Sequence, residues 1–131
     1  MKLLLDTHIW LWSLLEPERL GRRLTRKLDS PDVELWLSPI STWELAILAE
    51  RGRVKLDREV GRWVTEALTR VPLMEAPLTH EIALESRRLD LGHDDPADRF
   101  LVATARVLEL TLVTADERLL AGKACPVLDN R

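Results

Sequence analysis

The chain has 131 residues, a single cysteine, a formal net charge of -3 at pH 7 and a pI of about 5.6. Hydrophobic residues make up 46% of it and charged residues 31%, a balance typical of a soluble globular protein. The acidic charge excludes a protein that binds nucleic acid through overall basic charge, but it leaves room for a local basic patch.

These bulk properties predict one ordered domain over residues 1–131. The lone Cys125 has no partner for an internal disulfide, which favours a reducing compartment. The apolar run at the N-terminus is too short for a signal peptide, and no stretch is long enough to span a membrane. We therefore expect a cytoplasmic protein with no membrane association.

The first half of the chain alternates strands with helices. The predicted strands cover residues 3–5 and 34–38. The predicted helices cover residues 8–15, 17–28, 40–52 and 57–69. Leucines four residues apart among arginines make 17–28 an amphipathic helix with a basic outer face, and the 40–52 helix is expected to stop at Gly52.

The second half continues this alternation. The predicted strands cover residues 71–78, 111–114 and 126–128, of which the first and last are expected near edges. The predicted helices are 80–91 after an N-cap at Thr79, one opened by residues 93–96 and running to about 108, and a short one from Asp116. The alternation predicts an α/β fold with three layers, in which helices cover both faces of a mainly parallel sheet.

Four acids from distant stretches are expected to meet in this fold. Asp6 and Asp116 follow predicted strands, and Glu44 and Asp98 fall in the opening turns of helices on the same side, where such sheets bind ligands. Clustered carboxylates repel one another, and a divalent cation that prefers oxygen ligands relieves the repulsion. The histidines lack a zinc spacing, so we expect Mg²⁺ or Mn²⁺ and a site suited to phosphodiester hydrolysis.

Each acid also has a structural explanation. The pattern STWE is that of a capping box, so Glu44 could satisfy a helix terminus. Asp95 before a proline suits an N-cap, with Asp98 complementing the helix dipole. Asp116 suits a plain N-cap, whereas Asp6 either caps the next helix or points into a site. No single acid decides between structure and function.

Four ordered blocks carry these acids: LLLDTHIWLW, SPISTWELAILAERGRVKL, DDPADRFLVATA and LTLVTADERL. Over nearly the whole chain they resemble the PIN domain, specifically the VapC-like toxins of toxin-antitoxin pairs. The resemblance implies a three-layer α/β/α fold and an endoribonuclease dependent on Mg²⁺ or Mn²⁺. It also implies an RNA substrate, a VapB-like antitoxin partner and a homodimer. By motif, Asp6, Glu44 and Asp98 would hold the metal and Asp116 would complete a second site.

Other residues of the same blocks would support that centre. The resemblance places Thr114 where a hydroxyl often supports the metal or its waters, and Thr7 directly after the first acid. Asp95 is next to the proposed metal centre, and its simpler role is to cap its helix. His8 stands where many relatives have Ser or Asn, and Ala97 where a bulky apolar residue is frequent. We expect His8 to start a helix rather than to contact a phosphate.

Cations are needed to hold RNA beside an acidic centre. The candidates are Arg19, Arg22, Arg23, Arg26 and Lys27, or Arg51, Arg53 and Lys55. A basic helical face is more often simply solvated, and Arg99 is expected to pair with an acid. The first two helices would form a groove for an amphipathic antitoxin segment or a face for homodimerisation.

Tryptophans offer bases a stacking surface. We expect Trp10, Trp36 and Trp43 to be buried in the core or an interface, and Trp12 and Trp63 to be partly exposed.

Alternative functions remain beside the nuclease. Haloacid-dehalogenase phosphatases need a second aspartate where His8 stands, and response-regulator receivers need a mid-chain phosphoacceptor that is absent. A degenerate PIN module that binds RNA or protein without cutting, and a PIN nuclease of RNA processing outside a toxin pair, both fit the fold. Retention of all four acids favours an enzyme over the degenerate module.

Overall fold

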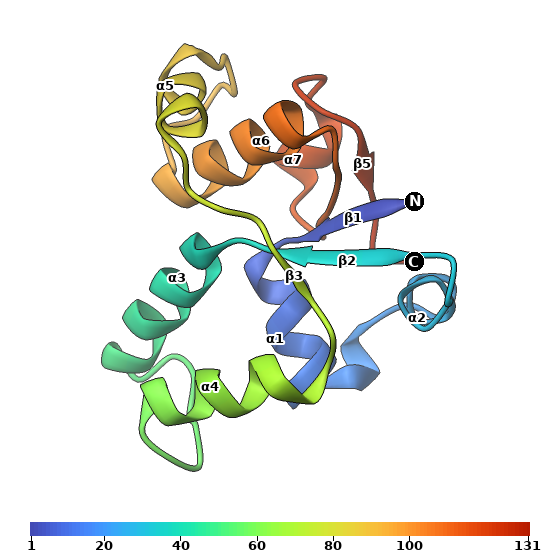
Figure 1. Cartoon of the computed structure of the whole chain (residues 1–131), viewed down its shortest axis with the longest axis vertical. Coiled ribbons are helices and arrows are strands. Elements are labelled where there is room, and N and C mark those ends of the chain that lie inside the picture. Colours follow the sequence, from blue (N-terminus) through green and yellow to red (C-terminus); the bar gives the residue numbers. More distant parts are fainter.

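The computed structural model describes residues 1–131 and has a parallel sheet at its centre (Figure 1). Its strands are β1 Lys2–Leu5, β2 Glu34–Leu37, β3 Met74–Glu75, β4 Thr111–Val113 and β5 Val127–Leu128. They form one five-stranded sheet in the order β3-β2-β1-β4-β5, and every neighbouring pair is parallel. The strands predicted near edges, those of residues 71–78 and 126–128, are β3 and β5, and both lie at the edges of the sheet.

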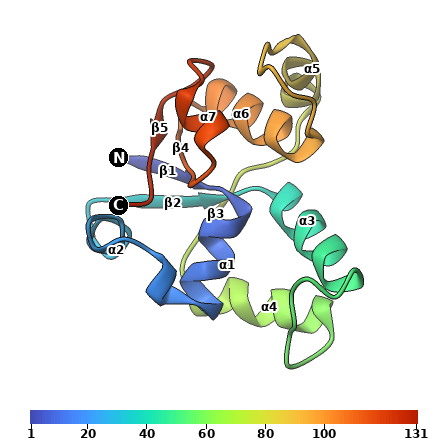
Figure 2. The ribbon, with the colours of Figure 1, turned by 180° about the vertical axis from the view of Figure 1, so that it is seen from behind.

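Helices cover both faces of this sheet. They are α1 Thr7–Leu15, α2 Arg22–Leu28, α3 Pro39–Glu50, α4 Val60–Arg70, α5 His80–Arg88, α6 Pro96–Leu108 and α7 Glu117–Ala121, with a 3-10 turn η1 at Pro17–Arg19. Figures 1 and 2 show α5, α6 and α7 on one side of the sheet and α1, α2 and α4 on the other. The predicted three-layer α/β/α fold is confirmed. No helix has the length and apolar character needed to cross a membrane.

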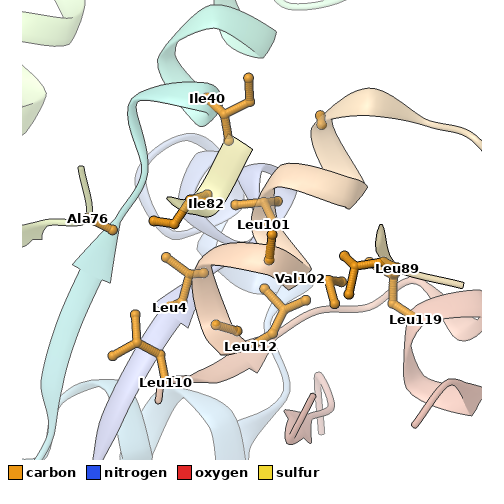
Figure 3. Close-up of a cluster of buried hydrophobic side chains, with 13 residues drawn as sticks. Leu4, Ile40, Ala76, Ile82, Leu89, Leu101, Val102, Leu110, Leu112 and Leu119 are labelled. Carbon is orange, nitrogen blue, oxygen red and sulfur yellow. The ribbon is translucent and has the colours of Figure 1, made fainter. Parts of the chain in front are cut away.

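The strands divide their side chains between two cores. Successive residues of a strand point to opposite faces, so Leu4 and Leu112 enter one apolar cluster while Leu3, Leu5 and Val113 enter the other. Figure 3 shows the first cluster, in which Leu101 and Val102 of α6 pack over Leu4 and Leu112. Burial on both faces explains why the strands have continuous apolar runs rather than alternating ones.

The strand order reverses at β1, which lies between β2 and β4. The chain leaves β1 into α1 on one face of the sheet, and it reaches β4 from α6 on the opposite face (Figure 2). The helix that follows β4, α7, lies on the same face as α6, so the helices that leave the carboxyl ends of β1 and β4 diverge. This divergence opens a crevice at the point where α/β sheets bind ligands.

The predicted single helix over residues 17–28 is wrong. It is split into η1 and α2 by an extended Leu20 and Gly21. The end of the chain causes the break, since the Gly21 N–H donates to Asn130 Oδ1 at 2.8 Å and the Leu24 N–H to the Arg131 carbonyl at 2.7 Å. A Cβ on Gly21 would lie 2.0 Å from the Arg131 carbonyl carbon. This tertiary contact overrides the local pattern, although the arginine face of α2 is exposed as predicted.

Helix starts follow their capping residues. Thr79 caps α5 as predicted, accepting a hydrogen bond from the Ile82 N–H at 3.2 Å. The helix predicted from residue 57 begins instead at Val60, because the Glu59 side chain accepts from the Gly61 and Arg62 N–H groups. The chain before Glu59 is therefore outside the helix.

Candidate functional site

Asp6 ends β1 and caps α1. One carboxylate oxygen, Oδ1, accepts from the Thr7 N–H at 2.7 Å, and the other, Oδ2, accepts from the Thr114 hydroxyl at 2.6 Å. Burial raises the pKa of Asp6 above its usual range, although both hydrogen bonds favour the ionised form. Asp6 therefore caps α1 and also lies at the strand end among the other acids. The two roles that the sequence offered as alternatives are both present.

Thr114 ties two strand ends to each other. Its buried hydroxyl donates to Asp6 and accepts from the Asp116 N–H at 3.0 Å. Asp116 in turn caps α7 by accepting from the Arg118 N–H at 2.9 Å. The hydroxyl predicted to support the site therefore fixes the first acid and the turn that carries the last.

Glu44 lies in the second turn of α3, away from the helix terminus. The N-cap of α3 is Ser38, whose hydroxyl accepts from the Ile40 N–H at 3.0 Å. Ser41 is already inside the helix, and its hydroxyl accepts from the Thr7 hydroxyl at 2.9 Å. The capping-box interpretation of Glu44 is therefore wrong, and its carboxylate has no helix terminus to satisfy.

The start of α6 supplies two further acids. Asp95 is the N-cap, accepting from the Asp98 N–H at 3.0 Å, as its place before Pro96 predicted. The Asp98 carboxylate points elsewhere and lies 2.8 Å from His93 Nε2. Burial raises the pKa of Asp98 to about 6, with His93 opposing the shift and neighbouring acids adding to it.

Arg118 closes one side of this group. Its guanidinium lies 2.9 Å from Asp116 Oδ2 and 3.6 Å from Asp98 Oδ2. The hydrogen bond from Arg118 holds the pKa of Asp116 below its usual range. Asp116 is therefore the acid of the group whose charge the chain already compensates.

One open cavity of about 370 Å³ brings these groups together. Its lining residues are Asp6, His8, Trp12, Glu44, Asp95, Asp98, Ala115, Asp116 and Arg118. Burial, with repulsion from Asp6 and Asp95, raises the pKa of the half-buried Glu44. All four acids predicted to converge do so, together with Asp95, while Thr7 and Thr114 lie behind them.

The donor set suits a hard divalent cation in its chemistry. The cavity offers five carboxylates and no thiol, and three of those carboxyls, Asp6, Glu44 and Asp98, have raised pKa values that a cation would relieve. As the side chains stand, no set of three or more His, Cys, Asp or Glu residues has the arrangement of a metal site. Their oxygens instead accept from Thr114, His93 and Arg118.

His93 and Arg118 are the site residues that sequence reasoning missed. Each reaches the acids from a short distance along the chain, five residues before Asp98 and two after Asp116. An arginine two residues after an N-cap aspartate is only weak evidence for a site residue, because the fold alone brings Arg118 close to Asp98. Arg99 is buried and donates to the carbonyls of Ser86 and Leu89, and it also pairs with an acid as predicted, since Asp94 Oδ1 lies 3.7 Å from its guanidinium.

The exposure of the tryptophans agrees with the prediction for three of the five. Trp10 is buried, and Trp12 and Trp63 are partly exposed, as expected. Trp36 is only half-buried, and Trp43 is 48% exposed, so Trp43 does not belong to the core, and its burial in an interface stays a prediction. Buried Ser41 and Leu45 each lie two positions from Trp43, about 200° around the helix, so its ring points away from the core.

The chain is similar in sequence to a known domain family and to one characterised protein. The sequence profile of the PIN domain matches residues 3–123. Ribonuclease VapC22 of Mycobacterium tuberculosis is 36% identical over 117 residues, which cover 88% of each chain.

Solved structures show the same fold at low identity. A chain of VapBC2 from Rickettsia felis bound to a promoter DNA fragment superposes with a TM-score of 0.73 at 15% identity, covering 98% of both chains. A chain of DNA-bound VapBC from Salmonella typhimurium superposes with a TM-score of 0.70 at 19% identity, again covering 98% of both.

Proposed function

The chain belongs to the PIN domain family, and on that premise we propose that it is a metal-dependent endoribonuclease and the toxin of a VapBC-type toxin-antitoxin pair. The observation that carries the proposal is the gathering of five carboxylates, from four separate stretches of the chain, around one open cavity at the carboxyl ends of β1 and β4. The similarity to a ribonuclease over most of both chains supports RNA as the substrate.

Asp6, Glu44 and Asp98 would hold the first cation, with Asp116 contributing to a second. Mg²⁺ or Mn²⁺ bound there would supply a water of lowered pKa and a counter-charge for the phosphodiester. The chain supplies orientation: a carboxylate has about four lone-pair positions, and Thr7 and Thr114 fix Asp6 through two of them. His93 holds Asp98 in the same way.

Charge in the free protein favours this role. Burial disfavours the ionised forms of Asp6, Glu44 and Asp98, because each carboxylate loses water without gaining a basic side chain that fully compensates it. A cation in the cavity would stabilise the ionised forms of all three. Such a site binds a divalent ion more tightly as the pH rises, since the ion must displace the proton of Asp98.

The proposal extends to the partners of the chain. A VapB-like antitoxin is the proposed inhibitor, since the superposable chains come from VapBC complexes. A homodimer and a cytoplasmic location belong to the same proposal. A PIN nuclease of RNA processing outside a toxin pair is the second candidate, favoured by the same site; a short antitoxin gene beside this one would decide for the toxin.

Cleavage of RNA by antitoxin-free protein tests the proposal. A mixed pool of structured RNAs is incubated with wild type in Mg²⁺, in Mn²⁺ and in EDTA, and with the variants Asp6→Asn and Asp32→Asn. We expect cutting that depends on the metal, is lost in Asp6→Asn and is unchanged in Asp32→Asn, an exposed aspartate before β2. Asparagine caps helices as well as aspartate does, so Asp6→Asn should stay folded, which circular dichroism checks.

Two results would count against a nuclease. Folded wild type that cuts no RNA with either ion would favour the binding module, and cutting that survives in EDTA or in Asp6→Asn would place the chemistry outside the acidic cavity.

A further inference from the structure

A second, larger cavity adjoins the acidic one. It has a volume of about 980 Å³ and lies between α1 and α3. His8, Trp12, Glu44 and Asp95 line both cavities. The two cavities therefore form one continuous groove that leads from the carboxylates out along the two helices.

Aromatic and apolar side chains form the walls of this groove. On α1, Leu11, Trp12 and Leu15 face it, and on α3 Trp43 and Ile47 do so from successive turns. The Trp12 ring is already engaged, with Arg19 at 4.4 Å from its centroid and His8 at 5.8 Å. Trp43 has no such aromatic or cationic partner and is 48% exposed, so its ring is free to receive a planar group.

Cations line the outer end of the groove. Arg51, Arg53 and Lys55 follow α3, are exposed and form no salt bridge. Gly52 lies between the two arginines with a φ of 68°, a left-handed conformation that turns the chain back after the helix. The groove thus runs from carboxylates at one end to three unpaired cations at the other.

We infer that this groove binds single-stranded RNA, with one base stacked on Trp43 and the phosphates beyond it held by Arg51, Arg53 and Lys55. The inference rests on the proposed function, since it delivers the strand to the acidic cavity. Proteins that bind single strands combine an aromatic platform with a basic track in this way. The cations lie at the end of the groove away from the carboxylates. A bound metal would not reach the RNA phosphates there, so these cations would compensate their charge.

Anisotropy of a fluorescein-labelled, 12-nucleotide single-stranded RNA of mixed sequence tests the inference. Binding is measured in EDTA, so that the strand stays intact, for wild type and for the variants Trp43→Ala, Trp43→Phe and Leu84→Ala. Leu84 is the matched control, since it is 57% exposed on α5 and does not line the groove. An RNA duplex of the same length has no unpaired base to stack on Trp43, so it measures binding through the phosphates alone.

Stacking sets the expected size of the change. Loss of one base–aromatic stack weakens binding by about 5- to 150-fold, so Trp43→Ala should raise Kd by that factor for the single strand, and Trp43→Phe by much less. Leu84→Ala should leave Kd unchanged, and the duplex should be insensitive to Trp43. Changing Arg51, Arg53 and Lys55 together to Gln should lower the slope of log Kd against log salt by about 2.

Cleavage of the same oligonucleotide in Mg²⁺ separates the two proposals. If wild type cuts it and Trp43→Ala binds and cuts equally well, the groove assignment is wrong and the nuclease stands. If the strand binds through Trp43 but is never cut, the groove stands and the nuclease fails. Trp43→Ala that leaves RNA binding intact while it abolishes binding of an amphipathic peptide helix would overturn the inference in favour of a protein occupant.

Discussion

Asp6 and Asp116 follow neighbouring parallel strands, yet their carboxylates lie in opposite surroundings. Asp6 is buried and accepts two neutral hydrogen bonds, from a backbone N–H and a threonine hydroxyl. Asp116 is more exposed and pairs with the guanidinium of Arg118. Burial accordingly raises the pKa of Asp6, and Arg118 lowers that of Asp116.

The difference divides the cavity into two halves. Asp6, Glu44 and Asp98 are carboxylates whose charge the fold leaves poorly compensated, whereas Asp116 already has a cation. A divalent ion would gain most from the first half, because there it would compensate carboxylates whose ionised forms burial disfavours. This contrast between the uncompensated and the compensated half generates four predictions, from the largest effect to the smallest.

Asp98→Asn and Asp116→Asn should separate the halves by activity. We expect Asp98→Asn to abolish RNA cleavage, since it removes a carboxylate of the uncompensated half. Asp116→Asn should leave measurable cleavage, because Arg118 already compensates this carboxylate and a divalent ion would gain less from it. Single-turnover cleavage rates of the two variants measure the contrast, and equal losses in both would erase it.

Thr114→Val removes the hydroxyl that holds Asp6 while preserving the shape of the side chain. Residues that orient metal-binding groups typically contribute about 10- to 100-fold to metal affinity or activity, so we expect a loss of that order in cleavage rate. Thr111→Val is the matched control at the other end of β4. A rate for Thr114→Val equal to that of the control would mean that Asp6 needs no such support.

The pH dependence of stability should have opposite signs in the two halves. The pKa of Asp98 is raised to about 6, so its stabilising contribution is complete below the ordinary aspartate pKa of 3.8 and is lost as the pH rises through about 6. Asp98→Asn should therefore be more stable than wild type at pH 8, by about 1 to 2 kcal/mol, with the difference vanishing near pH 4.

The lowered pKa of Asp116 predicts the reverse trend. Its contribution is present above the ordinary aspartate pKa of 3.8 and is lost as the pH falls through the lowered pKa of the folded state. Asp116→Asn should therefore be slightly less stable than wild type at neutral pH. Urea unfolding of both variants between about pH 2 and 8, without metal, measures the pair, because the Asp116 contribution changes only below pH 3.8. Parallel curves for the two variants would show that burial does not distinguish these acids.

Arg118→Gln should give the smallest effect. Its side chain is 60% exposed, and exposed ion pairs are weak, so removing this competing cation should tighten Mn²⁺ binding by no more than about 5-fold. Arg22→Gln on α2 is an exposed control away from the cavity. Weaker Mn²⁺ binding in Arg118→Gln would mean that the guanidinium assists the site rather than competing with it.

Much of the fold could be predicted from the sequence because its signals are local. The buried strand at Leu3 to Leu5, the N-cap at Thr79 and the N-cap at Asp95 depend on residues adjacent in the chain, and all are confirmed. The break at Gly21 could not be predicted, because it arises from contacts with the far end of the chain.

The candidate site shows the same division. The convergence of the acids follows from strand order and could be predicted. The place of His93 and Arg118, and the exposure of Trp43, depend on which way each side chain points after folding. The helical phase of Trp43 relative to Leu45 carried that information, but the prediction placed Trp43 on the inner side of the helix because it is next to Glu44.

Calorimetric titration of Mn²⁺ into RNA-free protein at pH 7.5 tests the central claim, that these carboxylates form one divalent-cation site. The wild type and Asp32→Asn should show saturable binding with the same affinity, and Asp6→Asn and Asp98→Asn should lose it while remaining folded. Saturable binding that persists unchanged in both cavity variants, or no binding by the wild type, would contradict the claim.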